Sequence, residues 1–162
     1  MQKRIREAIK AGDDAAAESL IASDPEQLAA TTVFGTWMHV VASHGRLRVV
    51  QFLARAGADV NARSGISGGT PLNEAASRGH LPVVQFLLSA GAAMETREPE
   101  VNPLFSAIYG GHPDIVRLLL ASGIDARVRY TGLRMRDMDA VAFARERGQL
   151  ALAEMVASHL SG

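Results

Sequence analysis

Apolar and polar positions along the chain follow a helical period in short blocks, which glycine and proline separate. The clearest block is "TPLNEAASRGHLPVVQFLLSAG", residues 70–91. Thr70 is a good helix N-cap, and Pro71 suits the first helical position because its missing N–H would have no partner there. Gly79 is typical of the residue that ends a helix, and Gly91 ends a second one that Pro82 begins. The pattern predicts two short helices joined by a tight turn.

Each of these helices has an apolar side that it cannot bury alone. In the first helix, Leu72, Ala75 and Ala76 form a stripe whose small side chains let a neighbouring unit approach closely. The apolar side of the second helix consists of Val83, Val84, Phe86, Leu87 and Leu88. Helices of this length are marginal in water, so their stability must come from stacking against further helices.

The same block recurs along the chain at a nearly constant spacing. Its inter-helix glycine aligns at Gly45, Gly79, Gly111 and Gly148, in steps of 34, 32 and 37 residues. A weaker copy places Gly12 another 33 residues before Gly45. Repetition at this period predicts a stack of similar units, each of which buries its apolar sides against the next.

The repeated block resembles the ankyrin repeat, a unit of about 33 residues with a β-turn, two helices and a T-P-L-H-x-A signature. The resemblance rests on "GTPLNEAASRGHLPVVQFLLSAGA" and covers nearly the whole chain. It implies an all-α solenoid of helix–turn–helix units with short β-turn fingers, with about five repeats that include two caps. The single domain, residues 1–162, divides into units at approximately 1–31, 32–64, 65–96, 97–129 and 130–162.

The chain departs from the family pattern at the start of the first helix in each unit. Trp37 stands where the first full unit should have Pro. Only His39 keeps the family's histidine, which is replaced by Asn73, Phe105 and Ala142. We therefore expect the Thr–His hydrogen bond typical of the family to be lost in three units.

Composition narrows the classes of function. Seventeen basic and 17 acidic side chains give a formal net charge of zero, so no global field attracts nucleic acid or anionic lipid. The absence of Cys excludes disulfides, thiolate nucleophiles and the usual structural zinc sites. No apolar run approaches the roughly 20 residues that span a bilayer, and the basic N-terminal segment lacks the apolar core of a secretory signal. We expect a cytoplasmic protein that does not bind membranes.

The residue types that carry enzyme chemistry have structural explanations in this chain. His39 and His80 occupy the family's usual histidine positions, and His112 repeats His80, so all three are expected to be structural. No two histidines have the i, i+4 helical spacing of a zinc site, and no compact cluster of ligands is evident. The glycine-rich "GISGGT", residues 65–70, lacks the lysine and the spacing of a phosphate-binding loop. We expect no catalytic residue, no metal and no cofactor, and therefore a protein that is not an enzyme.

The resemblance implies that function lies on the concave side of the solenoid, where ankyrin repeats bind proteins with their inner helices and turns. Phasing the repeat gives the solvent-facing positions there, and aromatic and arginine side chains are favoured because they dominate interface hot spots. The predicted partner-binding residues are Val33, Trp37, His44, Ile66, Arg78, Glu98, Tyr109, Arg129, Tyr130, Arg134, Arg136 and Arg147.

The stretch "RVRYTGLRMRDMDA", residues 127–140, concentrates four arginines in a chain without net charge. It contains the extra residues of the longest repeat step, so we expect an extended turn, the basic finger (residues 127–136), that reaches toward an acidic site on a partner. Asp139 is expected to cap the helix that follows. The preceding turn is acidic, with Glu95, Glu98 and Glu100, which suits a nucleic-acid backbone poorly.

Three roles stay open at this point. The leading one is a non-catalytic module, monomeric on its own, that binds a protein partner as a scaffold or an inhibitor. The second is a bacterial immunity protein or antitoxin that neutralises a cognate toxin, which the resemblance of the last unit to small stand-alone bacterial ankyrin proteins implies. The third is nucleic-acid binding through the basic finger.

Overall fold

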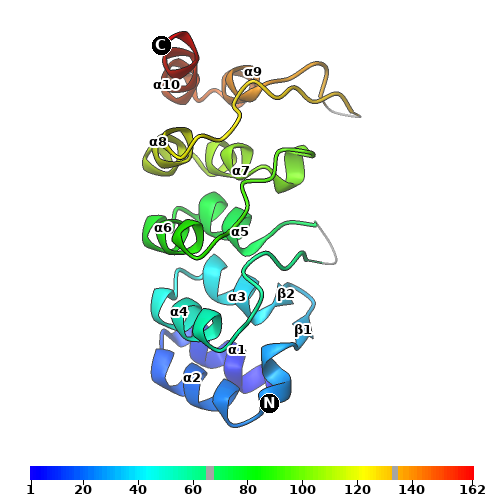
Figure 1. The fold of residues 1–162 in the computed structure, drawn as a ribbon, viewed down its shortest axis with the longest axis vertical. Helices are drawn as coiled ribbons and strands as arrows, with labels where there is room; N and C mark the ends of the chain where they lie inside the picture. Colours follow the sequence, from blue (N-terminus) through cyan, green and yellow to red (C-terminus); the bar gives the residue numbers. More distant parts are fainter. Residues whose placement is uncertain (65–67, 133–134) are drawn as a thin grey trace.

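The computed structural model describes residues 1–64, 68–132 and 135–162, and it consists of antiparallel helix pairs stacked along one axis (Figure 1). The first helices of the pairs, called the inner helices below, are α1 (Gln2–Ala11), α3 (Trp37–Ser43), α5 (Pro71–Arg78), α7 (Pro103–Gly110) and α9 (Ala140–Glu146). The second helices, the outer helices, are α2 (Asp14–Ala22), α4 (Leu47–Arg55), α6 (Leu81–Ser89), α8 (Pro113–Ala121) and α10 (Leu150–Ser161). The predicted all-α stack is confirmed.

The segments between pairs project on the side of the inner helices, and they include the little strand structure that the described residues contain (Figure 1). β1 (Thr31–Thr32) and β2 (Gly35–Thr36) form an antiparallel hairpin. Two short 3-10 turns, η1 (Pro25–Leu28) and η2 (Pro99–Val101), precede the next inner helix. In the last finger, Tyr130 and Met138 form an isolated antiparallel bridge.

The helix ends agree with the local sequence signals. Gly79 follows α5 with φ of 80°, a left-handed conformation that glycine adopts without the steric cost of a Cβ. Thr70 forms a capping box at the start of α5, where its side chain accepts from the backbone N–H of Asn73. The carboxylate of Asp139 accepts from the N–H of Ala142, so the predicted cap of α9 is confirmed.

The Thr–His hydrogen bond was expected to be lost in three units, and for one of them this expectation is corrected, because Asn73 makes an equivalent hydrogen bond to Thr70. Its Oδ1 accepts from the N–H of Thr70 at 3.0 Å and from the Thr70 hydroxyl at 2.7 Å. The amide oxygen is a hydrogen-bond acceptor, as is an unprotonated imidazole nitrogen, so it can replace that nitrogen at this position. At α7 the cap is supplied by Asn102, whose side chain accepts from the N–H groups of Leu104 and Phe105.

Adjacent repeats are tied by side chains that reach a backbone oxygen in the preceding unit. Nε2 of His80 donates to the carbonyl of Ser43 at 3.0 Å, and Nε2 of His112 donates to the carbonyl of Ser77 at 3.1 Å. Arg46 has the same position one repeat earlier, and it donates to the carbonyl of Gly12 at 2.7 Å. These contacts give His80 and His112 the structural role expected from the sequence.

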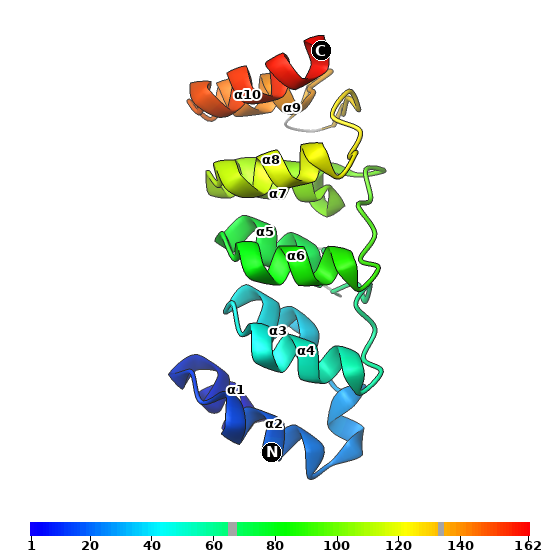
Figure 2. The same ribbon diagram turned by 60° about the vertical axis from the view of Figure 1, so that its left-hand side comes forward.

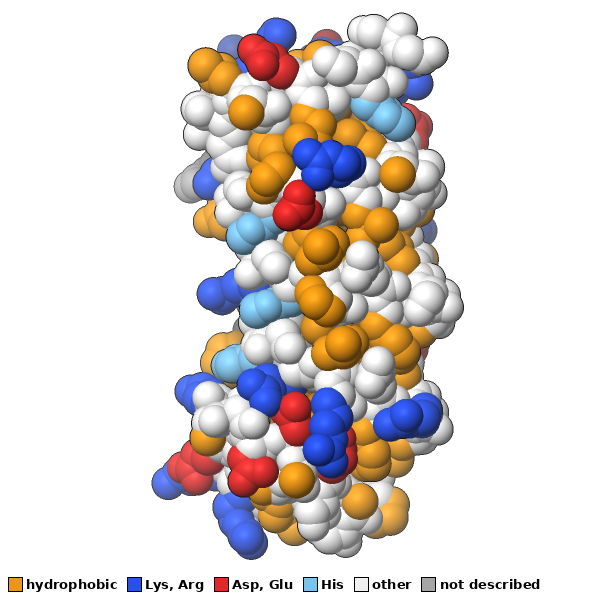
Figure 3. Space-filling model, turned by 90° about the vertical axis from the view of Figure 1, so that its left-hand side faces the viewer, with side chains coloured by type: hydrophobic (Ala, Val, Ile, Leu, Met, Phe, Trp, Pro, Cys, Tyr) orange, Lys and Arg blue, Asp and Glu red, His pale blue; other side chains and the backbone are white. Residues whose placement is uncertain are grey.

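The core runs continuously through the stack. Leu53, Leu87 and Leu119 hold equivalent positions in successive outer helices and are fully buried. Each contributes about 1.5–3 kcal/mol by leaving water, a contribution that depends on the neighbouring repeat. Figure 2 shows the pairs lying nearly parallel to one another, and Figure 3 shows apolar side chains scattered over the face of the outer helices. Among the described residues, no helix is both long and apolar enough to cross a membrane.

Candidate functional site

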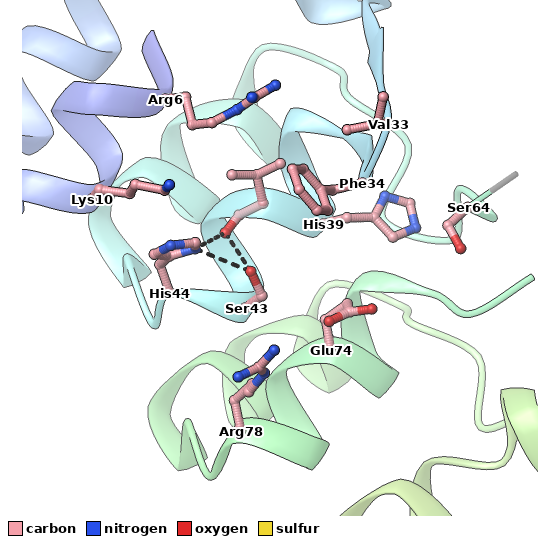
Figure 4. A pocket seen from close by; sticks show the side chains of 11 residues that line it. Arg6, Lys10, Val33, Phe34, His39, Ser43, His44, Ser64, Glu74 and Arg78 are labelled. Atoms are coloured by element: carbon pink, nitrogen blue, oxygen red, sulfur yellow. Dashed lines mark hydrogen bonds between the residues drawn. The ribbon is translucent and has the colours of Figure 1, made fainter. Parts of the chain in front are cut away.

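The inner face is hollowed where α1, α3 and α5 meet the β1–β2 hairpin (Figure 4). The hollow has a volume of about 300 Å³. The side chains around it are Arg6 and Lys10 of α1, Val33 and Phe34 of the hairpin, His39, Val40, Ser43 and His44 of α3, Ser64, and Glu74 and Arg78 of α5. The hollow therefore spans three successive repeats.

The hairpin holds two apolar side chains out in solvent. Val33 is 64% exposed and Phe34 is 61% exposed, at the tip between β1 and β2. The tip is fixed by Thr32, whose hydroxyl donates to the carbonyl of Gly35 and accepts from the N–H of Phe34. Gly35 has φ of 95°, and a Cβ there would lie 2.8 Å from the ring of His39, so the hairpin sits directly on α3. Val33 was predicted from the sequence, but Phe34 was missed.

Cations surround these apolar side chains. The guanidinium carbon of Arg6 lies 5.4 Å from the ring centroid of Phe34, within cation–π range. Figure 4 shows Arg6 and Lys10 entering from α1 on one side, and Glu74 and Arg78 from α5 on the other. Glu74 is the only carboxylate among the described lining residues. The hollow is therefore locally positive in a chain without net charge.

His39 and His44 behave differently at the floor of the hollow. His39 is buried: its Nε2 donates to the carbonyl of Gly69, and its Nδ1 accepts from the N–H of Thr36. Burial lowers the pKa of His39 below its ordinary value, so it is a neutral structural group. His44 is exposed, as predicted, and its Nδ1 lies 2.9 Å from the carbonyl oxygen of Val40. It is the imidazole that a ligand in the hollow could contact.

A second exposed aromatic lies further along the inner helices. Tyr109 of α7 is 60% exposed, and the guanidinium carbon of Arg147 lies 4.1 Å from its ring centroid. The same guanidinium carbon lies 5.7 Å from the ring of Phe143. A guanidinium at this distance from an aromatic ring is attracted to its face, and tyrosine and arginine are enriched at interface hot spots. Both predicted residues of this region are thus on the surface and in contact with each other.

Sequence comparison agrees with the repeat geometry. The family model described as "Ankyrin repeats (3 copies)" matches residues 5–98 and 38–130, which together cover most of the chain. The chain belongs to the ankyrin-repeat family. No curated protein matches it. Ankyrin repeats are generally modules of protein–protein interaction, and this fact gives the exposed side chains of the inner face their significance.

Two of the predicted contact residues of this ankyrin protein are buried, so those two assignments are corrected. Trp37 is 1% exposed, and its indole N–H points to the side-chain oxygen of Gln27 at 3.4 Å. Tyr130 is 7% exposed; its hydroxyl donates to the carbonyl of Thr96 at 2.6 Å and accepts from Nδ2 of Asn102 at 2.9 Å. Burial raises the pKa of Tyr130. Both side chains pack the base of a finger and cannot reach a partner.

The remaining predicted residues divide between the surface and the undescribed parts of the chain. Arg78 and Glu98 are exposed, as are Arg129 and Arg136. Ile66 and Arg134 lie outside the residues that the structure describes. Most of the predicted positions are therefore exposed, but only Val33, His44 and Arg78 line the hollow.

The basic finger is less positive than its arginine count indicates. Nε of Arg129 donates to the carboxylate of Asp137 at 2.6 Å, and Nη1 donates to Asp139. This contact lowers the pKa of Asp137 and raises that of Arg129. Arg127 donates to the carbonyl of Leu160 at 3.0 Å. Two of the four arginines thus already have partners within the chain.

The acidic turn is also partly neutralised. Glu95 accepts from Arg97 at 2.9 Å and lies 3.8 Å from Arg63. The hydrogen bond from Arg97 lowers the pKa of Glu95. Glu98 lies 3.9 Å from Arg63. In the part of the chain that is described, no cluster of three or more His, Asp or Glu side chains could hold a metal ion.

Proposed function

We propose that this ankyrin protein is a non-catalytic module that binds one protein partner on the face formed by its inner helices and turns. The observation that carries the proposal is the exposure of large apolar side chains on that face. Val33, Phe34 and Tyr109 are each at least 60% exposed although the core nearby is well filled. Exposed aromatics next to arginines are the usual anchors of a protein interface.

The proposed surface has two parts. The first is the hollow, with Val33, Phe34, His44 and Arg78 among its lining residues. The second is the pair formed by Tyr109 and Arg147, two repeats further along. Glu98, Arg129 and Arg136 lie on the neighbouring fingers, where exposed charges would affect the rate and orientation of docking more than the affinity.

The test is an affinity capture with three immobilised forms of the chain. Wild type is compared with Phe34→Ala/Tyr109→Ala and with Leu150→Ala, which removes a side chain that is 62% exposed on the outer helix α10. A partner identified by mass spectrometry is then purified and titrated by calorimetry. We expect the double variant to weaken binding at least tenfold, because interface anchors each cost 1–2 kcal/mol or more, and Leu150→Ala to bind as wild type. Equal binding by all three forms would refute the inner face as the contact surface.

A toxin that the chain neutralises is the more specific form of this proposal, and the resemblance to stand-alone bacterial ankyrin proteins supports it. This form of the proposal predicts that one stoichiometric partner is captured and that this partner is toxic when expressed alone. Co-expression of the wild-type chain should suppress the toxicity, and co-expression of Phe34→Ala/Tyr109→Ala should not. Nucleic-acid binding is the weaker alternative, because Arg129 is already bonded to Asp137 and Asp139. Retention on duplex DNA at low salt that is lost in Arg129→Ala would favour it instead.

A further inference from the structure

We infer that the hollow between α1, α3 and α5 takes an acidic peptide segment of the protein partner, with an apolar side chain of that segment seated against Phe34. The inference rests on the proposed function and adds the chemistry of the bound segment. Two properties of the hollow carry it. Cations without ionic partners converge there, and an exposed aromatic ring lies among them.

The cations of the hollow lack the ion pairs that neutralise Arg46 and Arg48 in the same repeats. Arg46 is bound to Asp14 at 2.7 Å, and Arg48 is bound to Glu18 at 2.9 Å. In contrast, Arg6, Lys10 and Arg78 form no ion pair with any described residue. Three charges from two different helices face one space and have only Glu74 as a nearby carboxylate among its lining residues. An anionic ligand would relieve their mutual repulsion.

The side chain of Arg6 provides a second observation in favour of a ligand with a hydrogen-bond acceptor. Its Nε is buried and has no hydrogen-bond partner within the described residues. A buried donor without an acceptor is unfavourable, by about 1–3 kcal/mol in typical cases. The same guanidinium stands over the ring of Phe34, so an acceptor that approaches it also approaches the aromatic ring. A ligand that carries an acidic group next to an apolar group would therefore match this arrangement.

A peptide fits these requirements better than other polyanions. The hollow holds about 300 Å³, room for a few side chains. A nucleic-acid backbone presents negative charge at every residue and would place some of it beside Glu74, which is unfavourable. A flat bilayer surface cannot follow the inner face of a curved repeat stack. A peptide can alternate glutamate or aspartate with one leucine or phenylalanine, and this alternation matches cations on either side of Phe34.

The test uses the full chain and a random dodecapeptide library displayed on phage. Peptides enriched by repeated selection are synthesised with a fluorescent label, and their affinity is measured by anisotropy. We expect the enriched sequences to have a net negative charge and at least one large apolar residue. Their affinity should fall steeply as salt is raised, because exposed charges are screened over roughly 10 Å at 0.1 M salt.

Matched variants locate the binding. Lys10→Gln/Arg78→Gln removes two exposed cations of the hollow, and Arg4→Gln/Arg55→Gln removes two exposed cations that do not line it. Both pairs change the net charge equally and neither touches the core, so both variants should fold as wild type. The first pair should weaken peptide binding about fivefold or more at low salt. The control pair should leave it within about twofold. Phe34→Ala should weaken it about tenfold.

Each other result overturns the inference in a distinguishable way. Equal losses in the two charge variants would mean that net charge alone attracts the peptide. If the enriched peptides are neutral or basic, or if no peptide is enriched, the inference that the hollow binds an acidic segment is refuted. The proposed function is then still decided by the capture experiment above. Binding of a duplex DNA probe or of phosphatidylserine vesicles, sensitive to Lys10→Gln/Arg78→Gln and stronger than that of any peptide, would assign the hollow to another polyanion.

Discussion

Gly79→Ala is the substitution whose cost the structure specifies most closely. Gly79 ends α5 with φ of 80°, and a Cβ there would lie 2.6 Å from Cε1 and 2.7 Å from Nδ1 of His112. The imidazole is held over the glycine by its hydrogen bond to the carbonyl of Ser77 at 3.1 Å. Alanine at position 79 therefore has to adopt a strained backbone and also displace the ring that joins two repeats.

The two contributions can be separated. The left-handed backbone costs alanine about 1 kcal/mol or slightly more, and the loss of the His112 hydrogen bond costs about another 1 kcal/mol. The total of about 2 kcal/mol would lower Tm by roughly 4–8 °C in a chain of this size. Gly91→Ala is the matched control. Its φ is 88° and no atom lies within 4 Å of the added Cβ, so it incurs the backbone cost alone.

The assay is urea unfolding followed by far-UV circular dichroism, with amide hydrogen exchange to reveal repeats that open separately. The variants are Gly79→Ala, Gly91→Ala, His112→Ala and the double variant Gly79→Ala/His112→Ala. Removing the ring first should reduce the cost of Gly79→Ala to that of Gly91→Ala, because only the backbone term is left. The His112 contact does not determine the requirement for glycine if Gly79→Ala lowers the free energy of unfolding no more than Gly91→Ala does. The same conclusion holds if Gly79→Ala lowers it equally in the wild-type and His112→Ala backgrounds.

Three further predictions follow from the buried polar groups and the buried indole. His39 has a pKa lowered by burial, so its contribution to stability is complete above about pH 6.5 and declines as pH falls, because the unfolded chain takes up the proton first. His39→Asn should therefore reduce the loss of stability between pH 7.5 and 5 in urea titrations at those pH values. Asn102→Ala should cost about 2–3 kcal/mol in the same assay, because it removes the α7 cap and the donor to Tyr130. Trp37, the only tryptophan, should be shielded from acrylamide in the folded protein and quenched after unfolding; strong quenching of the native state would contradict its burial.

The helices and their ends could be predicted because their signals are local. Pro71 and Gly79 act through their own backbone geometry, and the repeated spacing gives the stack without any knowledge of distant contacts. Trp37 could not be placed in this way. Its burial depends on the η1 turn, ten positions earlier, which folds back so that Gln27 meets the indole. Aligning the repeats places such a residue on a turn, but it does not show whether the preceding segment folds over the residue and buries it.

The candidate site was predictable as a face but not as a hollow. Phasing the repeat identified Val33, His44 and Arg78, but it omitted Phe34, whose exposure follows from the tight β1–β2 hairpin. Charge counting failed for the opposite reason. The arginines of residues 127–136 look like the strongest cationic group in the sequence, yet the reversal of the chain at the Tyr130–Met138 bridge lets Asp137 and Asp139 reach Arg129. The positive surface lies instead in the hollow, where Arg6 and Lys10 of α1 and Arg78 of α5 face one space and form no ion pair with any described residue.

The position of the hollow connects binding to the stability of the stack. Its walls belong to three repeats whose relative placement depends on Arg46 bound to Gly12 and Asp14, and on His80 bound to Ser43. A peptide that touches both α1 and α5 has its full set of contacts only when these repeats are stacked. A bound peptide would therefore stabilise the N-terminal half of the protein by RT ln(1 + L/Kd), where L is the ligand concentration, and this term rises with the logarithm of L once L exceeds Kd. In a solenoid whose short helices are marginal alone, a ligand bound as proposed would join the repeats further, as His80 and His112 already do.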